Sequence, residues 1–390
     1  MSLNAPDSGP RILFFSGGSA LRELSRELIR HTSNSIHLVT PFDSGGSSAE
    51  ISRAFDLFSV GDLRNRLMAL ADPNQTGRKD IHSLFTHRFH KKSDNAVLLN
   101  ELYLAASGKA ESLSRVPAGA ARVIRGFLKS FLKYMPADFD LRGASVGNLI
   151  LTGGLLAGNR RVGPVIKRVS ALAGTKGIVR PVCNRHLQLA AVLESGELIV
   201  GQHLLTGKEV PPLSVPVSEI FLVKSTESPT RVLPFISPYV RSLIRSADLI
   251  IFPFGSFYTS LLACLLVAGV GRAVASNPCP KVFIPNPYDD PEQLGLSLTQ
   301  SVKVLKNCLQ RDLPPSRYGS RVLDTVLIDQ ERGDYRGAID ALEFSASGVK
   351  LQNIRLITEK SKPGFDPSLM AKVLMEMAGQ SSPSSFCLSS

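Results

Sequence analysis

The first forty residues alternate between apolar runs and a helical pattern, and this order constrains the fold more than any other feature of the chain. Residues 11–15 form an apolar run that ends in the sequence S-G-G-S at 16–19. Apolar side chains then recur at helical spacing over residues 20–31, and residues 36–39 are a second apolar run. A strand, a helix and a strand in this order predict a βαβ unit. We therefore expect an α/β fold with a mostly parallel sheet and helices on both of its faces.

A polar turn follows each of these two strands. The first turn contains Gly17, Gly18 and Ser19, and the second begins at Asp43. Parallel sheets bind ligands beyond the carboxyl ends of their strands, so we expect both turns at one edge of the sheet. Backbone N–H groups and hydroxyls in such turns bind phosphate, although a tight turn and a solvated loop would also explain them. Asp43 is followed by five small residues that let the backbone approach a ligand closely, namely Ser44, Gly45, Gly46, Ser47 and Ser48.

A third polar segment, G-D-L-R-N at 61–65, follows a helical pattern that resumes at residue 51. Its carboxylate, guanidinium and amide come from Asp62, Arg64 and Asn65, and they suit a phosphate site. A helix cap is the alternative explanation. The chain contains neither the G-x-G-x-x-G motif of dinucleotide-binding proteins nor the G-x-x-x-x-G-K-[ST] motif of P-loop nucleotidases. Those two classes are therefore not predicted.

Residues 248–260 repeat the arrangement of a strand followed by a polar turn. The apolar run at 248–253 breaks into F-G-S-F-Y-T-S, and a helix is expected from residue 261. Helix capping would use one or two of the hydroxyls in this turn, and the segment supplies four. We therefore predict a second anion-binding turn, formed by Gly255, Ser256, Tyr258, Thr259 and Ser260.

The remaining segments differ in pattern. Residues 1–10 are predicted to be a flexible leader, residues 72–142 a mostly helical insertion and residues 379–390 a disordered tail. Residues 11–71 and 143–378 are left for the core. A helix is expected to begin near Asn148, and a β-hairpin is expected at 187–201, just after Asn184. The alternation continues with a helix near 335–342 and a strand at 354–357.

The charge balance limits the choice of partner. The 390-residue chain has a formal net charge of +12, which favours anionic ligands such as nucleotides and phosphorylated metabolites. The basic residues are spread along the chain and accompany no binding motif, which argues against nucleic acid. Five widely spaced cysteines without a C-x-x-C pair indicate reduced thiols and a cytoplasmic location. No signal peptide and no run long enough to span a bilayer are visible, so no membrane partner is expected.

Taken in order, these motifs resemble the CofD/YvcK family, which includes 2-phospho-L-lactate transferases and nucleotide-sugar-binding gluconeogenesis factors. The resemblance implies a Rossmann-like core with a smaller flanking part, and it implies a homodimer. The G-D-x-R-N and G-S-x-Y-T-S segments are closer to the YvcK branch. The matching segments are S-G-G-S at 16–19, D-S-G-G-S-S at 43–48, G-D-L-R-N-R-L-M-A-L at 61–70, S-V-G-N-L at 145–149, G-S-F-Y-T-S at 255–260 and F-D-P at 365–367.

The resemblance also implies roles for single residues. Asp43 would be the catalytic group and would position a metal ion, Mg²⁺, or a substrate hydroxyl. Arg64 would neutralise phosphate charge, while Asp62 and Asn65 would orient that arginine or a ribose. The residues at 45–48 and 255–260 would surround the phosphates of the ligand.

Weaker assignments concern two amides and two histidines. Asn148 and Asn184 would contact the ligand, and His186 and His203 could carry protons, although structural roles are the simpler explanation for both histidines. Two functions remain open at this point. The protein could bind a nucleotide or a nucleotide-linked phosphate, such as a UDP-sugar, in a regulatory or metabolic role. Alternatively, it could be an Mg²⁺-dependent phosphotransferase of the 2-phospho-L-lactate transferase type that forms a phosphodiester from a nucleotide-activated donor.

Overall fold

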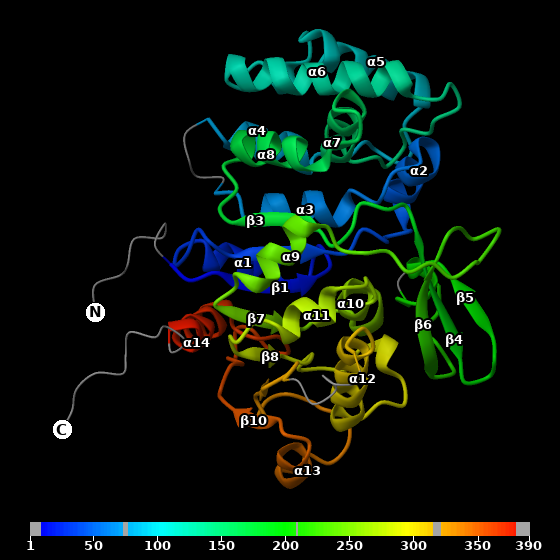
Figure 1. The fold of residues 1–390 in the computed structure, drawn as a ribbon. Coiled ribbons are helices and arrows are strands. Elements are labelled where there is room, and N and C mark those ends of the chain that lie inside the picture. Colours follow the sequence, from blue (N-terminus) through cyan, green and yellow to red (C-terminus); the bar gives the residue numbers. More distant parts are fainter. Residues whose placement is uncertain (1–8, 73–76, 208–209, 315–320, 380–390) are drawn as a thin grey trace.

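A seven-stranded parallel sheet forms the centre of the molecule (Figure 1). The computed structural model describes residues 9–72, 77–207, 210–314 and 321–379. The strand order is β10-β9-β8-β7-β1-β2-β3, and every neighbouring pair is parallel. The α/β fold predicted from the first forty residues is therefore confirmed. The strands are β1 (Ile12–Ser16), β2 (Ile36–Val39), β3 (Ile178–Pro181), β7 (Leu249–Phe252), β8 (Lys281–Phe283), β9 (Thr325–Ile328) and β10 (Lys350–Asn353).

The side of the sheet on which the chain adds new strands changes at β1, although all strands run in the same direction. The chain adds β2 and β3 on one side of β1, and it later returns to add β7, β8, β9 and β10 on the other side. Leu13 of β1 thus pairs with Ile36 of β2 on one side and with Ile250 of β7 on the other. In a parallel sheet such a reversal opens a crevice beyond the carboxyl ends of the two central strands, because their connections leave in opposite directions.

Alternate side chains of β1 pack into two different hydrophobic cores, one on each face of the sheet. Ile12 and Phe14 point to the face covered by α1 (Arg22–Leu28) and α14 (Pro367–Gly379). Leu13 and Phe15 point to the opposite face, where α9 (Pro238–Arg245), α11 (Val270–Ala275) and α12 (Leu298–Gln310) pack. All four strand side chains have no exposed surface, and burying each one contributes about 1.5–3 kcal/mol. The sheet is therefore covered on both faces, as predicted.

A separate helical layer extends from the β3 end of the sheet (Figure 1). Residues 72–142, predicted to be mostly helical, hold α4 (Lys79–Thr86), α5 (Asn95–Ser107), the 3-10 turn η2 (Glu111–Leu113) and α6 (Ala118–Tyr134). They share one core with α3 (Gly61–Ala69), α7 (Val146–Ala157) and α8 (Val162–Ala173). α6 and α7 pack closely because Gly153 has no side chain, and a Cβ there would meet the carbonyl of Phe127.

A small antiparallel sheet in the order β5-β4-β6 lies beside the carboxyl edge of the main sheet. Its strands are β4 (Gln188–Leu193), β5 (Leu198–Val200) and β6 (Val217–Val223), so the predicted hairpin is confirmed. The 3-10 turn η3 (Gln202–Leu204) follows β5. The α/β core with a smaller flanking part is thus observed.

Two helices begin earlier than the sequence pattern predicted. α2 (Gly46–Phe55) begins within the run of small residues instead of at residue 51. The predicted helix start at 261 is also wrong, because the π-helix η4 (Phe257–Leu262) already includes the hydroxyl-rich segment and continues into α10 (Ala263–Leu265). Hydroxyl residues predicted to line loops therefore lie within helical turns, and their backbone N–H groups are not all accessible.

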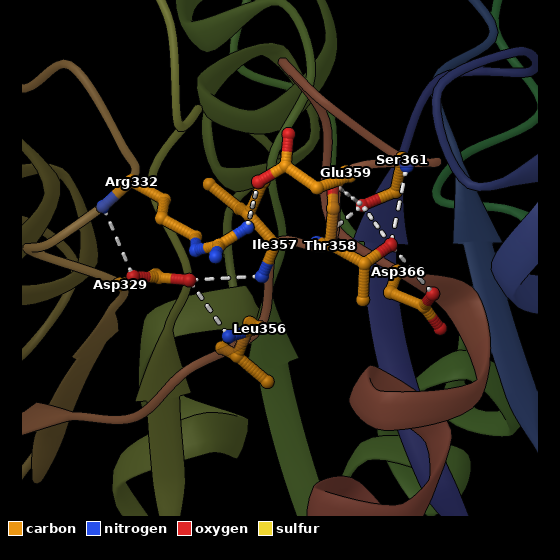
Figure 2. A network of polar contacts seen from close by, with 8 residues as sticks. All are labelled: Asp329, Arg332, Leu356, Ile357, Thr358, Glu359, Ser361 and Asp366. Carbon is orange, nitrogen blue, oxygen red and sulfur yellow. Dashed lines mark hydrogen bonds and ion pairs between the residues drawn. The ribbon is translucent and has the colours of Figure 1, made fainter.

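The predictions near the C-terminus are wrong in two places. α13 (Ala341–Ala346) overlaps only the last two residues of the helix predicted near 335–342, and Gly337 within that segment has a φ of +83°. β10 precedes the predicted strand at 354–357. Figure 2 shows the reason: the N–H groups of Leu356 and Ile357 each donate to one oxygen of Asp329, at 2.8 Å, instead of to a strand.

Other expectations concern the chain ends, the cysteines and the membrane. Residues 1–8 of the predicted leader and 380–390 of the predicted tail lie outside the described residues. The cysteines that the structure describes all carry free thiols. Within the described ranges, no helix combines the length and the apolar character needed to cross a bilayer.

Candidate functional site

A cavity of about 480 Å³ opens at the reversal point between β1 and β7. Polar turns that follow β1, β2, β7 and β8 line it, together with Asp62 of α3 and the segment after β5. The predicted site residues among its lining are Gly17, Gly18, Ser19, Asp43, Gly45, Asp62, Gly255, Ser256 and Ser260. The turns after β1 and β7, which are far apart in sequence, therefore meet at one edge of the sheet.

The turn after β1 requires glycine because other parts of the chain approach it closely. A Cβ at Gly17 would lie 2.5 Å from the hydroxyl of Ser260, and a Cβ at Gly18 would lie 2.5 Å from a carboxylate oxygen of Asp62. These distances are too short for any side chain. Gly255 has a φ of +126°, a backbone conformation that favours glycine. The three glycines hold the two turns and α3 together around the cavity.

Arg66 supports the first turn from below, and the sequence analysis did not identify it. Its side chain has no exposed surface. Its guanidinium donates to the hydroxyl of Ser25 at 2.5 Å, to the hydroxyl of Ser16 at 3.3 Å and to the carbonyl of Gly17 at 2.9 Å. Burial lowers the pKa of Arg66 to about 10, while Asp62 acts in the opposite direction. Arg66 lies three positions after Leu63 and four before Leu70, both buried, and this helical spacing is the signal that could have revealed the buried support.

Carboxylates dominate the charge around the cavity. Four aspartates line it, Asp43, Asp62, Asp289 and Asp290, and no lysine or arginine is among the described lining residues. Asp289 forms an ion pair with Arg336 at 2.6 Å. Asp43 accepts a hydrogen bond from the N–H of Gly45 at 3.1 Å. A bare phosphate entering this cavity would meet like charge, so a cation is needed beside it.

The lining of the cavity would suit a hydrated magnesium ion better than a metal ion held by protein ligands alone. Mg²⁺ is typically held by one or two carboxylates, several waters and the phosphates of a substrate. Asp43 and Asp62, which both line the cavity, would supply hard oxygen ligands. Within the described part of the chain, no group of three or more histidine, cysteine, aspartate or glutamate side chains is placed to hold a metal ion alone. The ligand set would therefore depend on a bound phosphate.

The prediction that Tyr258 and Thr259 bind a ligand disagrees with the structure, because neither residue lines the cavity. Their backbone N–H groups both donate to one oxygen of Glu292, at 2.9 Å, and the Thr259 hydroxyl donates to the other at 2.5 Å. The N–H of Phe257 donates to Asp290 at 3.0 Å. Buried carboxylates thus occupy the donors at this helix start, and a phosphate cannot use them.

The charge state of this carboxylate pair depends on burial. Desolvation, and after it the neighbouring Asp290, raises the pKa of Glu292 to about 7. The hydrogen bonds from Tyr258 and Thr259 act in the opposite direction. Burial also raises the pKa of the Tyr258 phenol to about 12, so that group stays protonated. Asp290 lines the cavity and caps the turn that carries Glu292, which connects the site to this buried pair.

Arg64, predicted to neutralise phosphate charge, and Asn148, predicted to contact the ligand, both lie outside the cavity lining. The Arg64 Nε donates to the Asn148 Oδ1 at 3.2 Å, and both side chains are buried. Burial, together with the nearby charges of Arg88 and Arg22, lowers the pKa of Arg64 to about 10. The two residues therefore connect α3 to α7.

The remaining predicted residues also lie outside the lining. Ser44 hydrogen-bonds the Nδ1 of His203 at 2.8 Å, and Ser47 accepts from Arg88 at 3.3 Å. Gly46 is the first residue of α2, at a φ of +50°. The other residues in this group are Ser48, which packs against the position of Gly61, Asn65, which packs against the position of Gly18, and Asn184, which lines a separate hollow beside Arg180 and Tyr239.

The two histidines differ. His203 lines the cavity, whereas His186 forms a 2.9 Å contact with Asp56 away from it. Lining residues that the sequence analysis missed come mainly from the segment after β8 and from η3. The segment after β8 contributes Asn286, Tyr288, Asp289 and Asp290, which the rule that ligands bind beyond strand ends would have predicted. Gln202 of η3 and Thr206 just after it are the other two.

The F-D-P segment at 365–367 has a structural role (Figure 2). Asp366 caps α14 by accepting from the N–H groups of Ser368 and Leu369, and its other oxygen accepts from the Thr358 hydroxyl at 3.2 Å. The edge of one ring packs against the other between Phe365 and Phe254, which lines the cavity, with centroids 5.3 Å apart. This segment therefore braces the turn after β7 and lies outside the cavity lining.

The reversal point, the glycine turns and the cavity between them define a Rossmann-like α/β fold, with its cavity at the place where folds of this class bind ligands. A family model described as 2-phospho-L-lactate transferase CofD matches residues 12–357, and the chain belongs to that family. The resemblance seen in the sequence is therefore confirmed.

Relatives with known names support the same family. The chain is 28% identical to the gluconeogenesis factor of Bacillus subtilis, over 83% of this chain and 79% of that protein. It is 27% identical to a putative gluconeogenesis factor of a Nostoc species, over 95% and 69%. A crystal structure of a member of the UPF0052 family from Bacillus halodurans has a TM-score of 0.67 and 21% identity, and covers 95% of this chain and 99% of that one. This last similarity shows that the fold is shared.

Proposed function

We propose that this protein binds a nucleotide or a nucleotide-linked phosphate, such as a UDP-sugar, in the cavity between β1 and β7, in a regulatory or metabolic role. The observation that carries the proposal is the position of the cavity at the strand reversal, with glycine turns on both sides. Its volume of about 480 Å³ lies within the range typical of small-molecule sites. The gluconeogenesis factors among the relatives are consistent with a ligand from carbohydrate metabolism.

The lining divides into groups with different tasks. The turn at Gly17 and Gly18 lets a phosphate approach the backbone, and the hydroxyls of Ser256 and Ser260 face it from the second turn. Asp43 would hold Mg²⁺. When bound, the ion would neutralise phosphate charge that four aspartates alone would repel. Asn286 lines the cavity beyond Gly255, whose N–H donates to it at 2.8 Å.

A second candidate is phosphoryl transfer, as in the enzyme that gives the family model its name. In such a reaction an acceptor hydroxyl forms a bond to the activated phosphorus of the donor, and a nucleoside monophosphate leaves. The observation that favours it is His203, which lines the cavity and hydrogen-bonds Ser44 at 2.8 Å. An imidazole held in this way could accept the proton that the hydroxyl loses.

A thermal-shift screen with UDP-glucose, GDP and GTP, each with Mg²⁺ or with EDTA, tests the proposal. A ligand at a hundred times its dissociation constant stabilises the folded state by about 2.7 kcal/mol. We expect stabilisation that needs Mg²⁺ and is lost in Asp43→Asn. Asp138→Asn, at an exposed position in the helical layer, is the matched control and is expected to respond like the wild type.

The same samples separate the two functions. Stabilisation without release of a nucleoside monophosphate supports binding, whereas Mg²⁺-dependent release supports transfer. If none of the nucleotides stabilises the protein, both proposals fail. The homodimer that the family resemblance implies stays a prediction, and sedimentation equilibrium tests it.

A further inference from the structure

A second hollow lies along α9 and α11, and its lining is basic where that of the first cavity is acidic. These two helices pack against each other and cover one face of the main sheet (Figure 1). The groove beside them has a volume of about 610 Å³. Its floor includes the small residues Ala268, Gly269 and Ala273, which leave space for a side chain from another molecule.

Arginines surround this groove. Arg241 and Arg245 are one helical turn apart on α9, so they share a face, and Arg272 of α11 and Arg311 after α12 complete the set. All four side chains are exposed. Asp312 is the only acidic residue among the described lining residues, and its carboxylate accepts from the backbone N–H groups of Gly269 and Arg272.

The lining keeps an excess of positive charge, because four arginines face one carboxylate among the described lining residues. Arg272 and Arg311 donate to the carbonyls of Asp312 and Leu266, which fix the guanidinium groups but carry no net charge. Arg241 and Arg245 take part in none of the ion pairs found among the described residues. Two like charges one turn apart destabilise an isolated helix, so their placement needs another explanation.

Large apolar side chains stand at the same groove. Leu233 is 57% exposed and Phe235 is 72% exposed, and both line it. Phe235 is held in place by a bridge between its backbone and that of Ala268. An exposed aromatic ring beside a cluster of guanidinium groups is typical of a protein interface, where such side chains are the ones that contribute most to binding.

We propose that this groove binds an acidic peptide segment of another protein, with carboxylates facing the arginines and an apolar side chain packed against Phe235. The concave shape suits a peptide better than a flat membrane surface. A second copy of this chain presenting the same groove is disfavoured, because the four arginines of one copy would then face the four arginines of the other. The proposal is independent of what the cavity between β1 and β7 binds.

A direct test measures fluorescence anisotropy of a labelled peptide in which glutamate alternates with leucine and phenylalanine. A second peptide of the same charge, with serine in place of the apolar residues, is the control ligand. We expect Arg241→Glu/Arg245→Glu to weaken binding of the first peptide by at least about tenfold. Phe235→Ser is expected to weaken it by about fivefold and to leave binding of the serine peptide unchanged.

Matched variants distinguish a specific groove from general attraction. Lys129→Glu/Lys133→Glu changes the net charge equally on an exposed face of α6, and Leu342→Ser removes an apolar side chain that is 79% exposed. Neither is expected to affect binding. Equal loss in the lysine variant would overturn the proposal, and so would equal affinity for the two peptides. Preferential binding of a single-stranded oligonucleotide or of anionic vesicles, sensitive to the arginine variant, would also overturn it.

Discussion

Glu292 should make the protein less stable as the pH rises through neutrality. Its pKa in the folded state is raised from 4.5 to about 7, first by burial and then by Asp290. A raised pKa means that the folded state holds the proton more tightly than the unfolded chain does. The associated stability is therefore complete below about pH 4.5 and is lost as the pH rises to about 7, by about 3 kcal/mol in total.

Glu292→Gln isolates this effect while keeping the local contacts. The amide oxygen can accept the N–H groups of Tyr258 and Thr259, and the amide nitrogen can donate to the Thr259 hydroxyl, which reverses that bond. Urea unfolding of the wild type and the variant between about pH 4 and pH 8 gives the difference in the free energy of unfolding. We expect this difference to shift by about 3 kcal/mol in favour of the variant as the pH rises.

A matched substitution controls for the removal of one carboxyl group. Glu197→Gln changes an exposed residue in the turn between β4 and β5. The reasoning is refuted if Glu292→Gln and the wild type keep a constant difference in free energy of unfolding over this pH range. It is also refuted if the difference moves in the opposite direction, because that would mean that the folded state favours the charged carboxylate.

Two further substitutions test the turn after β1. Gly18→Ala places a Cβ 2.5 Å from an Asp62 oxygen, so we expect a loss of about 1–3 kcal/mol in urea unfolding and a weaker nucleotide response, whereas Gly126→Ala, on an open face of α6, should add about 0.5–1 kcal/mol. Arg66→Lys cannot reach Ser16, Ser25 and the Gly17 carbonyl together, and we expect it to lower the free energy of unfolding by at least about 2 kcal/mol. Wild-type stability in either Gly18→Ala or Arg66→Lys would contradict the packing described for this turn.

The sequence predicted those features that depend on local patterns. The apolar runs at 11–15 and 36–39 predicted the first two strands, because a buried parallel strand and a following helix have different periods. The rule that ligands bind beyond the carboxyl ends of parallel strands then predicted that Gly17 and Ser256 lie close together, and both line one cavity. Neither result required knowledge of contacts between distant parts of the chain.

The errors arise from contacts between residues far apart in sequence. The donors of Tyr258 and Thr259 seemed available to a ligand, but Glu292, more than thirty residues later, occupies them. Arg64 seemed suited to phosphate, but it pairs with Asn148 across 84 positions. A local sequence pattern shows which groups could bind a ligand. It does not show whether a residue elsewhere in the chain already forms hydrogen bonds with those groups. Only the folded chain decides between the ligand and that partner.

The most direct test of the proposed site is a crystal structure of the protein soaked with UDP-glucose and Mn²⁺, which replaces Mg²⁺ and can be located by anomalous scattering. We expect the diphosphate between the turns at Gly17 and Ser256, with the metal ion bound to Asp43. Well-defined ligand density outside this cavity, for instance beside Asn184 in its separate hollow, would contradict the account. A metal peak without a contact to Asp43 would contradict the assignment of that residue.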